Sequence, residues 1–412
     1  MSLKRELGVF GATMMGLGSI IGTGVFVSIG IAAGIAGPAV VLAIAMAAAV
    51  ATCNALNSAQ LAANHPVSGG TYEYGYRYLK PWLGFAAGWM FLCAKTASAA
   101  TAALGFSGYL LNFVGQETRW LIPVAIGTVI IITAIVLSGI RLSNRVNIVI
   151  VSITLTSLTA FVVAGLPEVS TNQLVMQIEP TSLLHASALM FVAYTGYGRI
   201  ATLGEEVLEP HRTIPKAIIL TLVISTLVYV AVAIVAVGAA GADKLQAATV
   251  KNAAPLEIVS RDFTWRVHWL VSLGAMTAML GVLLNLVLGL SRVGLAMGRR
   301  GDMPSAVSNV KVSVVVVGGL IAALAATGSI KTTWTFSAFT VLIYYAVTNL
   351  AALRLSANER LYGKPWAWVG LAACLSLAFA IEWQVWSVGL GVLAVGLLWH
   401  WFRSAMGYRQ LA

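Results

Sequence analysis

Charged residues are scarce in this sequence. Of its 412 residues, only 9% are Asp, Glu, Lys or Arg, whereas 59% are hydrophobic. A soluble domain typically contains about 25% charged residues, so a water-soluble fold is excluded. Charge-free apolar runs recur along the whole chain and leave no polar block for a separate soluble domain. We therefore predict one membrane domain, residues 1–412, surrounded by a lipid bilayer.

Motifs of metal and nucleotide chemistry are also missing. The three cysteines lie inside apolar runs, where a thiol packs like a small hydrophobe, and this argues against a disulfide framework. The five histidines are scattered, and neither an HExxH nor a CxxC pattern is present. No GxxxxGK[ST] motif occurs either, which argues against an ATP-driven pump. We expect no enzyme activity, no metal and no cofactor.

Long hydrophobic runs, in contrast, are abundant. A helix needs about 20 apolar residues to cross the hydrocarbon core, and this length predicts about twelve transmembrane helices in an all-α integral membrane protein. The predicted segments are 9–32, 38–62, 82–113, 119–138, 144–165, 182–207, 214–240, 264–298, 312–329, 333–354, 366–381 and 383–402.

The distribution of basic residues predicts the orientation. Of the 25 lysines and arginines, about 17 lie in loops on the side of the termini and about 6 on the opposite side. Basic loops stay in the cytoplasm, so we expect both termini to be cytoplasmic. The same asymmetry explains the net charge of +11 without a nucleic-acid partner. Short loops suggest a multi-pass protein of the cell (plasma or inner) membrane.

Two predicted helices contain glycine clusters that favour a break in the helix. Residues 18–26, GSIIGTGVF, place three glycines near the middle of the first helix, and residues 191–199, FVAYTGYGR, place two in the sixth. Glycine costs a helix interior about 1 kcal/mol relative to alanine. An unwound segment would present amides to a carboxylate and carbonyls to an ammonium, and two breaks five helices apart suggest an inverted repeat. The alternative is that these glycines only allow close helix packing.

Several motifs together resemble the amino acid-polyamine-organocation transporter family, over nearly the whole chain. They are GSIIGTGVF at 18–26, HPVSGGTY at 65–72, GFAAGW at 84–89, YTGY at 194–197, EEV at 205–207, RTIPKA at 212–217, SRV at 291–293 and GDMP at 301–304. The resemblance implies a LeuT-type fold of five plus five helices, about 9–165 and 182–354, with helices 1 and 6 broken and 366–402 peripheral. It also implies alternating access.

The resemblance further implies where a small-molecule substrate lies. The amides around Gly22, Thr23 and Gly24 would hold its carboxylate. The backbone carbonyls of Ile20, Val192 and Thr195 would hold its ammonium. Tyr197 would gate or cap the site, although ordinary packing explains this residue equally well.

The sequence departs from the family at the residues used for ion coupling. Many members carry a lysine in helix 5, where alignment places Thr154, and an acidic residue where this chain has Gly198. Thr154 and Thr277 could instead help to bind Na⁺, because hydroxyls are hard oxygen donors. The coupling ion is therefore expected to be H⁺ or Na⁺, with uncoupled exchange as the alternative.

Two basic residues lie at membrane depth, where a charge costs roughly 2.5–3.5 kcal/mol. Lys95 lies about fourteen residues beyond Pro81, roughly 21 Å along a helix. We hypothesise that it contacts an anionic or carbonyl-bearing substrate group, or supplies the cation missing from helix 5; a structural amine is the alternative. Arg199 and Glu206 are two helical turns apart and would form either a cytoplasmic gate or a static charge network.

These observations favour a secondary active transporter, a symporter or exchanger of amino acids or close analogues. A polyamine or organic amine carrier would be expected to have acidic residues in the pocket helices. A non-transporting receptor or subunit would be expected to have an appended soluble domain.

Overall fold

The computed structural model describes residues 7–65, 69–139, 144–201 and 207–405. Within these ranges the chain is helical, and its one β interaction is an isolated bridge between Leu7 and Val207. The predicted all-α class is confirmed.

The twelve predicted segments each overlap a helix. The main helices are α1 (Val9–Ile20), α2 (Ile29–Ala36), α3 (Val40–Asn64), α4 (Thr71–Tyr78), α5 (Pro81–Phe113), α6 (Leu121–Leu137), α7 (Asn144–Gly165), α8 (Pro180–Tyr194), α9 (Gly198–Ala201), α10 (Pro210–Ala240), α11 (Ala242–Asn252), α12 (Pro255–Ser260), α13 (His268–Arg299), α14 (Val310–Ala325), α15 (Ile330–Leu353), α16 (Lys364–Phe379) and α17 (Trp383–Ala405). Seven helical runs in the described ranges are long and apolar enough to cross a membrane, and the first, Val9–Asn64, contains two predicted segments. The chain is a multi-pass membrane protein.

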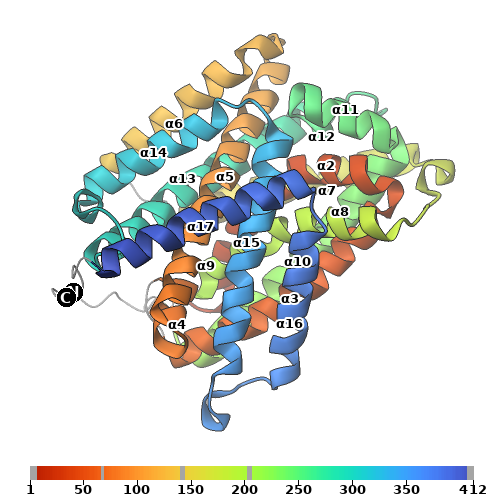
Figure 1. The fold of residues 1–412 in the computed structure, drawn as a ribbon. Coiled ribbons are helices and arrows are strands. Elements are labelled where there is room, and N and C mark those ends of the chain that lie inside the picture. The colour runs from red at the N-terminus through yellow and green to blue at the C-terminus, as the bar shows by residue number, and fades with distance from the viewer. Residues whose placement is uncertain (1–6, 66–68, 140–143, 202–206, 406–412) are drawn as a thin grey trace.

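Helix α5 lies at the centre of the bundle, against α13 and α15 (Figure 1). Its middle is rich in fully buried alanines, which let neighbouring backbones approach closely. Paired hydroxyls join α5 to α15: Ser98 lies 2.7 Å from Ser337, and Thr101 lies 2.8 Å from Thr333. Because the two pairs are about one turn apart on both helices, they fix the register of the antiparallel contact.

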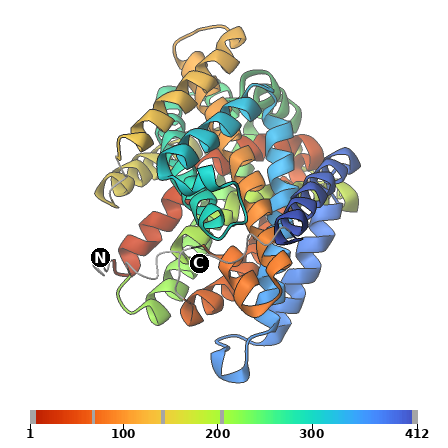
Figure 2. The ribbon, with the colours of Figure 1, turned by 60° about the vertical axis from the view of Figure 1, so that its left-hand side comes forward.

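The outer helices expose large apolar side chains. Ile131 of α6 is 61% exposed and Trp401 of α17 is 69% exposed. In Figure 2 the α16 and α17 helices, drawn in blue, lie at the edge of the bundle. Such a surface requires an apolar solvent, which a bilayer provides.

Three short helices were not predicted because they are too short to span a membrane. They are α4, before α5, and α11 and α12, between α10 and α13. Gly69 and Gly70 precede α4 with φ values of 129° and 55°, which glycine adopts without the strain of other residues. The α4 and α12 helices lie near opposite ends of α5 and so mark two faces of the protein.

A buried aspartate ties together the face near α4. Asp302 Oδ2 accepts hydrogen bonds of 2.6 Å from the hydroxyls of Tyr72 and Tyr76, and its Oδ1 lies 3.4 Å from His400 Nδ1 on α17. Burial alone raises the pKa of Asp302, but hydrogen bonds from His400, Tyr72 and Tyr76 outweigh it, and the pKa lies below its usual value. The ionised carboxylate therefore holds α4 and α17 against the loop after α13.

Replacing Asp302 with asparagine is expected to lower the melting temperature of the purified protein, with a loss of about 1–3 kcal/mol of unfolding free energy. A neutral amide oxygen is a weaker acceptor for the two tyrosine hydroxyls than the ionised carboxylate. A carboxyl with a lowered pKa stabilises the fold above its unfolded pKa and loses this effect as the pH falls through its folded pKa. The difference between wild type and variant should therefore shrink in acid.

The matched control is Asp262→Asn, because Asp262 forms an exposed ion pair with Lys244. Thermal denaturation in detergent across pH measures both variants. An Asp302→Asn melting temperature that equals wild type at neutral pH would contradict the role assigned to this carboxylate.

Candidate functional site

The first predicted break is present in the structure. Helix α1 ends at Ile20, and Ile21 has an extended backbone with φ −81° and ψ 99°. The chain resumes as a π-helix, η1 (Gly24–Ser28), which continues into α2. Gly24 packs tightly here, because a methyl group on it would lie 2.6 Å from Ala193 Cβ. Glycine thus both permits the break and allows contact with α8.

The second predicted break is milder, a 3₁₀ turn whose flanking residues keep helical dihedrals, and it lies directly against the first. Helix α8 ends at Tyr194 and passes through a 3₁₀ turn, η6 (Thr195–Tyr197), into α9. A methyl group on Gly196 would lie 2.3 Å from the carbonyl oxygen of Ser19. The backbones of the two broken helices therefore touch at Gly196.

Substituting Gly196 with alanine is expected to destabilise the protein by about 1–3 kcal/mol, because the two backbones must move apart. The control is Gly319→Ala in α14, where the added methyl meets open space; alanine should be neutral there or stabilise the helix by up to about 1 kcal/mol. Melting temperatures of the purified variants test this. Equal values for Gly196→Ala and wild type would show that the contact is looser than described.

A cavity of about 40 Å³ lies where the two breaks meet. It is lined by Ser19, Ile20, Thr23, Gly24, Lys95, Ser98, Val192, Ala193, Thr195, Val282, Leu286 and Trp334. Six of the eight predicted substrate residues are in this set. The volume accommodates only a few water molecules, so an amino acid can enter only if the lining helices move apart.

A second, larger cavity of about 260 Å³ lies between α3 and α10, but its lining is apolar apart from Thr52 and Thr226. Each of these hydroxyls donates to a carbonyl of its own helix, Ala48 and Leu222 respectively. This cavity therefore has no polar group oriented toward a ligand, and we assign the functional site to the smaller one.

Lys95 reaches the second break from the centre of α5. Its Nζ donates a 2.8 Å hydrogen bond to Thr195 Oγ1, which in turn donates to the Val192 carbonyl at 2.8 Å. The ammonium thus lies beside the carbonyls at the end of α8, where the helix dipole favours positive charge. Lys95 also lines the cavity, so its charge faces any bound molecule.

A tyrosine that was not predicted links the two breaks. The hydroxyl of Tyr229, on α10, lies 2.8 Å from the Ile20 carbonyl and 3.2 Å from the Ala193 carbonyl. In the sequence, Tyr229 is recognisable only as the single tyrosine within the apolar run 214–240. Its partners lie 209 and 36 residues away in the chain, so its role could not be inferred from spacing.

The predicted ammonium ligands all have protein partners in this closed arrangement. The carbonyl of Ile20 accepts from Tyr229, that of Val192 accepts from Thr195, and that of Thr195 lies 3.4 Å from Tyr345 Oη. The carbonyls of Val192 and Thr195 also accept from the backbone amides of Thr195 and Gly198, so both lone pairs of each are already used. The Ile20 carbonyl can still accept from a second donor. Thr23 also faces the cavity, and its buried Oγ1 has no hydrogen-bond partner among the described residues.

Two predicted substrate residues do not line the cavity. Gly22 faces α13, where a methyl group on it would lie 2.7 Å from Val282 Cγ2. Tyr197 is fully buried, with its ring centroid 5.5 Å from that of Tyr345.

Three of the four predicted gating and coupling residues are described, and none of these three lines this cavity. The hydroxyls of Thr154 and Thr277 each donate to a carbonyl of their own helix, Ile150 and Leu273 respectively, at 2.8 Å. Arg199 is half-buried in α9. Glu206 lies outside the described residues, so its pairing with Arg199 stays a prediction.

Comparisons with known proteins identify the family of this chain. The family model for amino acid permeases matches residues 11–409. An uncharacterized transporter of Mycobacterium tuberculosis (strain H37Rv) is 41% identical over 99% of this chain and 92% of its own length. A branched-chain amino acid permease of Bacillus subtilis is 31% identical over 75% of this chain and 70% of its own, and a methylthioribose transporter of the same organism is 28% identical over 74% and 69%. The chain belongs to the amino acid permease family, a family of membrane transporters within the amino acid-polyamine-organocation superfamily, as the motifs predicted.

Proposed function

We propose that this protein is a secondary active carrier that moves amino acids or close analogues across the cell membrane by alternating access. The observation that carries the proposal is the meeting of two broken helices at one small polar cavity. We further propose the five-plus-five inverted repeat, twelve spans and cytoplasmic termini expected from the sequence.

The substrate would occupy the cavity between the breaks. Its carboxylate would lie at the start of η1, near Thr23 and Gly24, where backbone amides and the positive end of a half-helix favour an anion. Its ammonium would lie at the carbonyls of Ile20 and Val192. The Thr23 hydroxyl, which has no hydrogen-bond partner in the part of the chain that the structure describes, is available to either group.

Lys95 would distinguish among substrates. Its ammonium adds a positive charge to a cavity whose described lining contains no acidic residue. A polyamine would be repelled there, so this alternative is disfavoured. A substrate carrying an additional carbonyl or hydroxyl group would be attracted, and the B. subtilis relative named as a methylthioribose transporter justifies testing a sugar.

Uptake into proteoliposomes tests the function. The purified protein is reconstituted and offered labelled leucine, arginine, glutamate, putrescine and methylthioribose, with an imposed H⁺ or Na⁺ gradient or with unlabelled substrate inside. Saturable uptake of an amino acid supports the carrier, and the gradient that drives it identifies the coupling ion or, if only internal substrate drives it, exchange. Uptake of putrescine alone would support an amine carrier, and no uptake of any compound would favour a non-transporting subunit.

A further inference from the structure

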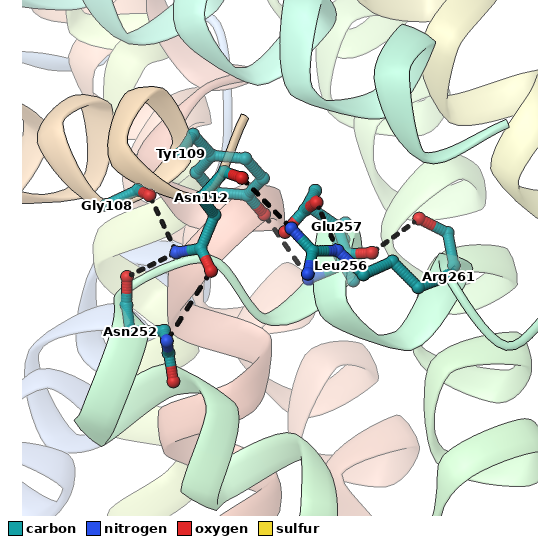
Figure 3. A network of polar contacts seen from close by, with 8 residues as sticks. Gly108, Tyr109, Asn112, Asn252, Leu256, Glu257 and Arg261 are labelled. Atoms are coloured by element: carbon teal, nitrogen blue, oxygen red, sulfur yellow. Dashed lines mark hydrogen bonds and ion pairs between the residues drawn. The ribbon is translucent and has the colours of Figure 1, made fainter. Parts of the chain in front are cut away.

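A short helix closes the face of the protein opposite α4. Helix α12 packs against η1, α11 and α13 near the Phe113 end of α5. Tyr109 of α5 joins it to the first break: its hydroxyl donates to the Phe26 carbonyl in η1 at 2.8 Å and accepts from the Leu256 amide of α12 at 3.3 Å (Figure 3). A movement of η1 that opens the cavity on this side must therefore disturb α12.

Glu257 of α12 is buried in this contact, with 1% of its surface exposed. Its Oε1 accepts a 2.7 Å hydrogen bond from Arg261 Nε, but its Oε2 has no hydrogen-bond partner among the described residues. A buried carboxylate with an unsatisfied oxygen is costly, and protonation lowers that cost. Consistently, burial raises the pKa of Glu257 despite the lowering effect of Arg261 and His268.

The charged groups around Glu257 are few. Arg261 is half-exposed and also donates to the Asn112 carbonyl of α5 at 3.0 Å (Figure 3), and His268 of α13 has a buried Nδ1 without a partner in the described residues. On α11, Lys244 is paired with Asp262. The η1 segment has no ionisable residue. The other ionisable residues of the neighbouring helices are Asp243 and Lys251 on α11, Arg145 on α7, His211, Arg212, Lys216 and Tyr229 on α10, and Arg292 and Arg299 toward the far end of α13.

We propose that Glu257 binds a proton when α12 closes over the broken first helix, and releases it when α12 moves away. The proton passes from water on the α12 face to Oε2, while Oε1 stays with Arg261. This inference rests on the proposed carrier function, because it assigns a ligand, H⁺, to the closing step of alternating access.

The direction of the pH effect follows from linkage. A carboxyl whose pKa is raised in the closed arrangement holds its proton more tightly there than when hydrated. The closed arrangement is therefore favoured at low pH and loses this advantage as the pH rises through the raised pKa.

Hydrogen–deuterium exchange of the full-length protein tests this without any substrate. The exchange rates of residues 255–260 are measured for wild type and Glu257→Gln at each pH from about 5 to about 9, and their ratio is taken. The intrinsic pH dependence of exchange is the same for both proteins and cancels in this ratio. The amide side chain of the variant is neutral at every pH, so α12 of wild type should become less protected than that of the variant as the pH rises, by up to about tenfold per unit. A ratio that is constant across pH would overturn the proposal.

Two further variants guard against misfolding. Arg261→Gln removes the partner of the ionised carboxylate, so the transition in α12 exchange should move to higher pH; a transition that stays in place would contradict the proposal. Glu168→Gln removes an exposed carboxylate that accepts from Thr264 on the same face, and it should retain the wild-type profile. The carrier function and the role of Glu257 are tested by different measurements. Absence of uptake by wild type rejects the carrier, whereas the exchange ratio decides the role of Glu257.

Discussion

Replacing Lys95 with methionine is expected to lower the transport rate by about ten- to hundredfold. The variant loses the 2.8 Å hydrogen bond to Thr195 Oγ1 and the positive charge in the cavity. A hydrogen bond to a charged group contributes about 1.5–3 kcal/mol, and each 1.4 kcal/mol corresponds to a factor of about ten. Initial uptake rates in proteoliposomes measure the effect.

The same variant separates the two proposed roles of Lys95. If the ammonium contacts the substrate, Lys95→Met should change the relative rates among the labelled compounds. The alternative is that the ammonium replaces the cation that many family members carry in their fifth transmembrane helix, which is α7 here and has Thr154 at that position. In that case the variant should alter the pH dependence of uptake instead. The control is Lys80→Met, because Lys80 is exposed at the start of the same helix. A Lys95→Met protein equal to wild type in rate, substrate range and pH dependence would leave only a structural role.

Replacing Tyr229 with phenylalanine is expected to lower transport by about tenfold. The hydroxyl contacts the carbonyls of Ile20 and Ala193, and its loss leaves two buried acceptors on the two broken helices without this donor, at a cost of about 1–3 kcal/mol. The relative position of the breaks should loosen, so the apparent affinity for substrate should weaken together with the rate.

The matched control for this substitution is Tyr74→Phe. The Tyr74 hydroxyl is buried and has no hydrogen-bond partner in the described part of the chain, so its removal should leave transport unchanged. Concentration-dependent uptake by both variants gives rate and apparent affinity. Wild-type values for Tyr229→Phe would show that the hydroxyl does not hold the breaks in their transporting geometry.

Much of the site could be predicted because its signals are local. The glycines at 22, 24 and 196 mark backbone that a side chain would obstruct, and both breaks occur there. Lys95 was identified by the free-energy cost of placing a charged side chain at membrane depth. It lines the cavity together with Thr23 and Val192. The resemblance supplied the substrate roles of the other predicted residues, and most of these residues line the cavity. Two of them, Gly22 and Tyr197, do not, and in the structure they face α13 and Tyr345.

The sequence by itself determined the class of the protein, its helices and the positions of its two breaks, because apolar length and glycine content act within a single segment. Only the tertiary structure decided which segments meet. It brought Gly196 against Ser19, Tyr229 against both breaks, and Glu257 into a buried position that leaves one oxygen without a hydrogen-bond partner among the described residues. The physical reason is that helical periodicity specifies which residues share a face, whereas small residues on many helices offer similar packing surfaces, so the partner of a face depends on the whole bundle.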